Sequence, residues 1–115
     1  MSLEPLHAAM RVTIADANIR RAAWRAGIEG PPFDQDSSLL RRLSELMRAD
    51  GRPIVLERLE LLLDRVQGRP LPGGFWKDLM RASEVLGLQD RLALFTDRFQ
   101  QALEAAASRS PDRSS

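Results

Sequence analysis

The chain of 115 residues contains no cysteine, one histidine and one lysine. Without cysteine it cannot form a disulfide framework, a thiolate zinc site, an iron–sulfur cluster or a cysteine nucleophile. A chain without cysteine forms no disulfide bonds and therefore does not need an oxidising compartment in order to fold. The N-terminal segment, MSLEPLHAAMRV, has neither the basic start nor the long apolar stretch of a signal peptide. We therefore expect a cytoplasmic protein.

The single histidine, His7, leaves little room for the common forms of catalysis. A Ser–His–Asp arrangement would have to use it, and no partner motif accompanies it, so we interpret His7 as a solvated helix residue. Glu57, Glu60 and Asp64 would share one helical face, as the carboxylates of di-metal bundle proteins do, but the Glu-x-x-His pairs of those proteins are absent. We expect that strip to be solvated or paired with arginine. The sequence thus predicts no enzyme, no metal and no cofactor.

Neither a strong charge imbalance nor a long apolar run is present. Seventeen basic residues stand against sixteen acidic ones, for a net charge of +1, and the charges are spread evenly along the chain. Nucleic-acid binding depends heavily on clustered Lys and Arg, so the even distribution of charge disfavours a nucleic-acid partner. No run approaches the ~18 apolar residues of a membrane span. Almost all the basic residues are Arg, which we interpret as genomic base composition rather than as a recognition site.

The most apolar stretch is PIVLERLELLLDRVQ, residues 53–67. As a helix it places six apolar side chains on one arc, and Ile54 with Leu61 on a second ridge. A helix apolar over more than half of its circumference needs neighbours on at least two sides. We therefore predict an all-α, compact bundle of about five helices packed around this central helix. The residues on the main arc are Val55, Leu56, Leu59, Leu62, Leu63 and Val66.

Apolar residues at spacings of three and four predict the other helices. The first carries one stripe, formed by Leu3, Leu6, Met10, Ile14, Ala17, Trp24 and Ile28. Thr13 and Asp16 leave open a capping box that restarts this helix near residues 11–13. Glycine followed by an apolar residue, at Gly27 and again at Gly87, predicts a left-handed helix end. The five predicted ranges are 3–27, 37–50, 53–67, 75–86 and 89–107.

Short connections and polar ends complete the predicted organisation. The loop at residues 29–36 should seal the core with Phe33, and the helices at 37–50 and 53–67 should form an antiparallel hairpin. Residues 1–107 are predicted as a single domain. The polar residues 108–115 are predicted as a disordered tail.

One segment, DLMRASEVLGLQDRLALF at residues 78–95, resembles the two helices and glycine-containing turn of a helix-turn-helix. The resemblance implies a DNA-binding transcriptional regulator that uses residues 78–98. The second helix would however present Asp90 beside Arg91 and few other hydrogen-bond donors, whereas a recognition helix needs donors. We keep DNA binding as the alternative, and a two-helix corner inside a bundle explains the same residues.

The remaining candidates are apolar. Leu71, Phe75 and Trp76 lie beside a loop that contains Pro and Gly, and paired exposed aromatics are typical of interface hot spots. The competing interpretation is that these aromatics plug the core. The ridge of Ile54 and Leu61 needs a cover, which a second copy in a symmetric dimer could supply. We therefore predict a small non-enzymatic protein–protein interaction module, adaptor or regulatory in role. Its partner would be another protein or itself, and its partner-binding residues would be Ile54, Leu61, Leu71, Phe75 and Trp76.

Overall fold

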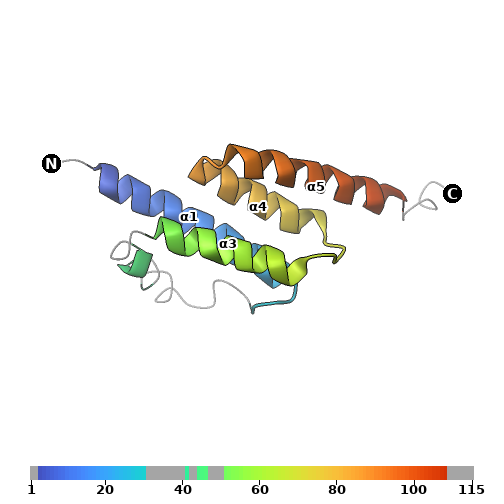
Figure 1. The fold of residues 1–115 in the computed structure, drawn as a ribbon, viewed down its shortest axis with the longest axis horizontal. Coiled ribbons are helices and arrows are strands. Elements are labelled where there is room, and N and C mark those ends of the chain that lie inside the picture. Colours follow the sequence, from blue (N-terminus) through green and yellow to red (C-terminus); the bar gives the residue numbers. More distant parts are fainter. Residues whose placement is uncertain (1–2, 31–40, 42–43, 47–50, 109–115) are drawn as a thin grey trace.

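In the residues that it describes, the computed structural model is built of α-helices (Figure 1). It describes residues 3–30, 41, 44–46 and 51–108. The helices are α1 (Glu4–Arg25), α3 (Arg52–Val66), α4 (Gly73–Leu86) and α5 (Gln89–Ser108), and residues 41 and 44–46 are also helical. The all-α prediction is confirmed, and each of these four helices begins and ends within two residues of its predicted bounds. None of the helices in the described residues is both long and apolar enough to cross a membrane.

The helices neighbour one another in the spatial order α3, α1, α4, α5. The most extensive packing is of α1 on α4 and of α4 on α5, and α3 packs on α1 over a smaller area. Figure 1 shows α4 and α5 together on one side of the molecule and α1 and α3 on the other. The helix that packs extensively on two other helices is therefore α4. The sequence pattern had predicted that the helix at 53–67 would take this central position. The reason is that α3 turns mainly one arc toward the rest of the chain.

That arc of α3 is buried as predicted. Val55, Leu59, Leu62 and Val66 belong to the common core with Phe75, Leu79 and Phe95, while Leu56 and Leu63 are partly buried against it. The two residues of the second ridge differ in burial. Ile54 is partly buried against the core, whereas Leu61 is 54% exposed. A helix with one covered arc needs fewer neighbours than the sequence pattern implied.

The face that α1 turns inward is opposite to the stripe of large side chains. At about 100° per residue, the buried positions of α1 lie across the helix from that stripe. They are mostly small: Ala9, Val12, Ala15, Asp16, Ile19, Ala22 and Ala23, followed by Ala26 just beyond the helix. Alanine lets two helix backbones approach closely, so the large core side chains of α4 can fill the space beside α1. The large side chains of the stripe from Leu3 to Trp24 lie on one face of α1, as predicted, and that face is turned away from the core, whereas Ile28 packs against the core beyond the end of the helix.

Both predicted glycine helix ends are confirmed. Gly27 and Gly87 have φ values of 76° and 72°. The N–H of Ile28 donates to the carbonyl of Ala23 at 2.9 Å, and that of Leu88 donates to Ser83 at 2.9 Å. These are the bonds of a Schellman end. The helix α1 is also continuous through residues 11–13, because Thr13 Oγ1 donates to the carbonyl of Ala9 and starts no new helix.

Other predictions fall outside the described residues. These are Phe33 with most of its loop, the greater part of the helix at 37–50 and of its hairpin, and nearly all of the tail at 108–115. Within the described part, Leu46 is buried and lies against Gly51.

The two sides of α3 should differ sharply in their tolerance of charge. We expect Leu59→Asp to abolish cooperative unfolding or soluble expression, because Leu59 is buried and an unpaired buried carboxylate can cost as much as the ~5–15 kcal/mol that stabilises a domain. Leu61→Asp, on the exposed side, is the matched control and should melt within a few degrees of the parent protein. Equal thermal melting of the two variants by circular dichroism would contradict the burial pattern of α3.

The left-handed glycines give a second test of the fold. Gly87→Ala should lower the free energy of unfolding by ~1–2 kcal/mol, because a Cβ strains the backbone at positive φ. Gly30→Ala serves as the control, since it lacks a positive φ and its Cβ would meet no atom within 4 Å. Urea unfolding measures both. Equal stability of the two variants would mean that Gly87 does not adopt the left-handed conformation.

Candidate functional site

The outer face of α1 carries a row of exposed large apolar side chains, closely spaced from Leu3 to Ile14 and followed after a gap by Trp24. It consists of Leu3, Leu6, Met10, Ile14 and Trp24, each between 42% and 64% exposed. Spacings of three, four, four and ten residues keep these side chains on one side of the helix, over ~30 Å at 1.5 Å per residue. Only Ala17 and Arg21 lie on the strip between Ile14 and Trp24. Single exposed apolar residues are ordinary, but a row of large ones is typical of a protein contact.

A buried carboxylate fixes α1 in this orientation. Asp16 is fully buried; its Oδ1 accepts from Nη1 of Arg58 at 2.6 Å and its Oδ2 from Nε of Arg20 at 3.0 Å. Arg20 also lies 4.0 Å from a carboxylate oxygen of Glu29. Because an unpaired buried carboxylate is costly, the α1 rotation that satisfies Asp16 is strongly favoured. That rotation directs the large apolar stripe outward.

Other arginines also connect segments that are distant in sequence. Arg25 Nε donates to Oδ2 of the buried Asp78 at 2.8 Å. Arg52 donates to the carbonyl of Leu86 at 3.0 Å, at the end of α4. The carbonyl and carboxylate groups that accept these hydrogen bonds lie far from the arginines in sequence. The even distribution of Arg along the chain therefore did not predict these contacts. Asp78 is buried although it is charged, and Arg25 neutralises its carboxylate there.

The five predicted partner-binding residues occupy different places. Phe75 is fully buried and acts as a core plug, while Trp76 is half-buried with its ring centroid 4.8 Å from that of Phe75. Leu71 is half-buried near Trp76, and Ile54 is half-buried against the core. Leu61 is exposed beside a hollow of about 370 Å³ between α1 and α3. The structure thus brings Leu71, Phe75 and Trp76 together, and it leaves Leu61 at a separate place.

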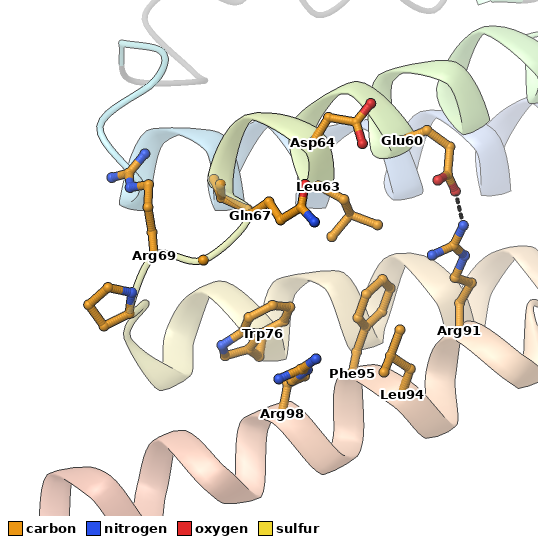
Figure 2. A pocket seen from close by; sticks show the side chains of 13 residues that line it. Glu60, Leu63, Asp64, Gln67, Arg69, Trp76, Arg91, Leu94, Phe95 and Arg98 are labelled. Atoms are coloured by element: carbon orange, nitrogen blue, oxygen red, sulfur yellow. Dashed lines mark hydrogen bonds and ion pairs between the residues drawn. The ribbon is translucent and has the colours of Figure 1, made fainter.

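A trough lies between α3 and α5 (Figure 2). Its volume is about 680 Å³. Trp76 and Phe95 lie in it, with ring centroids 6.1 Å apart, and Leu63 and Leu94 approach from α3 and α5. We call this feature the α3–α5 trough. Its lining residues are Glu60, Leu63, Asp64, Val66, Gln67, Gly68, Arg69, Pro70, Trp76, Arg91, Leu94, Phe95 and Arg98.

An ion pair spans one end of the trough. Arg91 of α5 donates to Oε2 of Glu60 on α3, as the dashed line in Figure 2 marks. The expectation that the strip of Glu57, Glu60 and Asp64 is solvated or paired with arginine is therefore confirmed at Glu60, and Glu57 and Asp64 are exposed. Among the described residues, no group of three or more His, Cys, Asp and Glu side chains could hold a metal ion. His7 is exposed near the start of α1.

The segment that resembles a helix-turn-helix forms a different geometry. Figure 1 shows α4 and α5 side by side in opposite directions, whereas the helices of that motif cross at ~90–120°. Gly87 provides the turn, and Phe95 packs into the core. On the outside of α5, Asp90 and Asp97 alternate with Arg91 and Arg98, so the face is not strongly basic.

Comparison with known proteins finds no matching family model, no matching curated protein and no matching solved structure. The function is therefore inferred from the surfaces described above.

The stability of the fold should depend on the hydrogen bond that Arg58 of α3 donates to the buried Asp16. We expect Arg58→Met to lower the free energy of unfolding by ~1.5–3 kcal/mol, because the apolar part of the side chain is kept while a charged hydrogen bond to a buried carboxylate is lost. Arg65→Met, at an exposed position on the same helix, is the control and should change stability by less than ~0.5 kcal/mol. Chemical denaturation compares them. If the variants are equally stable, Arg58 does not hold Asp16.

Proposed function

We propose that this protein is a small, non-enzymatic helical module that binds another protein through the outer face of α1. The partner is a different protein or a second copy of the chain, and the role is that of an adaptor or regulator. The observation that carries the proposal is the strip of five large exposed apolar side chains on α1. The absence of cysteine favours a cytoplasmic setting for this activity.

The physical argument concerns water. Each large side chain of the strip keeps about half of its surface in contact with solvent, and removal of apolar surface from water contributes roughly 25 cal/mol per Å². A helix with apolar residues in a three-four rhythm suits a partner helix or groove. The hydrogen bonds that hold Asp16 fix α1 before any partner arrives, so the strip needs no rearrangement to bind.

The alternative, a DNA-binding regulator that uses residues 78–98, has less support. The antiparallel arrangement of α4 and α5 offers no projecting recognition helix, and the net charge of +1 supplies little attraction for phosphates.

The proposal is tested with the double variant Met10→Lys, Ile14→Lys. We expect loss of self-association in light scattering over a range of concentrations, or loss of a partner that is first identified by mass spectrometry and then reconstituted with purified protein. The unfolding midpoint should not change, because both side chains are exposed. The matched control, Gln100→Lys with Ala107→Lys, adds the same charge to exposed positions of α5 and should bind normally.

Two outcomes count against the proposal. One is a mass near 12.9 kDa at every concentration, together with no reconstituted partner that depends on Met10 and Ile14. The other is an equal loss of binding in the α5 control, which would trace the effect to added charge.

A further inference from the structure

A hollow between α1 and α3 combines an apolar floor with charged side chains at its rim. Its volume is about 370 Å³, near the lower end of the ~300–1,000 Å³ of small-molecule pockets. Ile19 and Ala23 of α1 and Leu62 of α3 are buried and form its floor, and Leu61 is exposed at its edge. We call this feature the α1–α3 hollow. The floor favours a ligand with an apolar part, because contact with it removes that part from water.

Two arginines at the rim are held close together because they share one carboxylate. Nη1 of Arg58, on α3, donates to Oδ1 of Asp16 at 2.6 Å. Nε of Arg20, on α1, donates to Oδ2 of the same carboxylate at 3.0 Å. Both arginines line the hollow, and their side chains keep 33% and 23% of their surface exposed. The hollow therefore has two adjacent guanidinium groups that a ligand can reach.

The charges around the hollow do not balance among the described residues. The carboxylate of Asp16 lies against two guanidinium groups, and a second carboxylate, that of Glu29, is 4.0 Å from Arg20. Arg65 lies two turns after Arg58 on the same side of α3 and also lines the hollow. It makes no hydrogen bond or ion pair to the part of the chain that the structure describes. Three positive charges thus stand against two negative ones, which favours a ligand with a single negative charge.

Hydrogen-bond donors are also left over beside the shared carboxylate. An arginine presents five N–H donors in a planar fork. Arg58 uses one nitrogen in its contact with Asp16, and Arg20 uses Nε there and has only the 4.0 Å approach of Nη1 to Glu29. The remaining donors match a carboxylate, which accepts from a guanidinium group through both oxygens. A phosphate group fits less well, because its charge of about −1.5 to −2 at pH 7 exceeds the imbalance.

We propose that the α1–α3 hollow binds a small monocarboxylic acid with a compact apolar body. The carboxylate accepts hydrogen bonds from Arg20 and Arg58, and the apolar body lies on the buried floor between α1 and α3. This site goes beyond the protein-binding role proposed for the outer face of α1 and does not depend on it. Because the hollow exists only where α1 and α3 pack together, the ligand binds the folded chain and stabilises it.

The test is a titration of the full chain with phenylpropionate. We expect saturable heat in calorimetry at millimolar concentration, and a Tm that rises with ligand concentration because only the folded chain binds. Two probes serve as matched controls. Phenylpropionamide keeps the shape without the charge, and acetate keeps the carboxylate without the apolar body. Each should bind at least about tenfold more weakly, because one lacks the charged hydrogen bonds and the other lacks the apolar contact.

Nuclear magnetic resonance of isotope-labelled protein locates the ligand. Saturation with phenylpropionate should shift the backbone amide signals of residues 19–23 and 58–65 most, because these segments line the hollow. The signals of residues 91–98, which line the α3–α5 trough instead, should change little.

Substitutions at exposed positions test the charge argument without touching the floor. Leu61→Asp adds a negative charge at the edge of the hollow and should weaken binding of phenylpropionate about tenfold. Leu61→Lys should bind it at least as well as the parent. Arg65→Gln should weaken binding several-fold without changing stability, since Arg65 has no partner among the described residues to lose. The control, Arg81→Gln, removes the same charge from an exposed position on α4 and should bind as the parent does.

The adjacent guanidinium groups are tested by Arg58→Lys. Lysine keeps a positive charge for Asp16 but lacks the planar fork, so binding of phenylpropionate should weaken several-fold. Phenylpropionamide should bind this variant and the parent equally. A general loosening of the fold would instead weaken both probes alike, and chemical denaturation checks that unfolding stays cooperative.

Several results would overturn the proposal. These are the absence of saturable binding, equal affinity for phenylpropionate and its amide, and shifted signals that centre outside the hollow. Tighter binding of phenyl phosphate than of phenylpropionate would assign the hollow to phosphate esters instead. Unchanged affinity in both Leu61→Asp and Arg58→Lys would place the ligand elsewhere. Met10→Lys with Ile14→Lys should bind phenylpropionate as the parent does, so failure at the hollow does not bear on the outer face of α1.

Discussion

The close packing of the small-residue face of α1 against α4 is the constraint on which the rest of the structure depends. Alanines at positions 15, 22 and 23 allow the large side chains of α4, among them Phe75 and Leu79, to fill the core beside α1. A helix can turn only one face toward a given neighbour. Once the small face is inside, the large stripe of α1 is outside, and the most apolar exposed surface of the described chain is a consequence of core packing.

Buried carboxylates reinforce this choice of face. Asp16 and Asp78 each lie in the interior, and each is held by an arginine from another helix: Asp16 by Arg58 of α3 and Asp78 by Arg25 of α1. Such pairs contribute little net stability, since desolvation offsets much of the attraction, but any arrangement that breaks them is costly. Their main effect is therefore on specificity. They link α3 to α1 and α1 to α4, and so fix the rotation and the height of these helices relative to one another.

The row of helices also explains why the trough exists. The helix α5 packs on α4, and α3 packs on α1 over a smaller area, while the ion pair of Glu60 and Arg91 joins α3 to α5. Trp76 is half-buried in the space between them, and the ring of Phe95 beside it is fully buried. The structure therefore has two distinct surface features: a row of exposed apolar side chains on α1, and a concave trough between α3 and α5.

The amino-acid sequence by itself determined the helices, their ends and the buried arc of α3. These features depend on local periodicity and on glycines such as Gly27 and Gly87 that end a helix within a few residues. It also brought Trp76 forward as a surface candidate. What it could not decide was which face of α1 is buried, because both faces are apolar and a size criterion favours the larger one. The inward positions of Asp16 and Asp78 were equally undetermined. Each depends on a residue more than twenty positions away, and only the packing of whole helices brings such residues together.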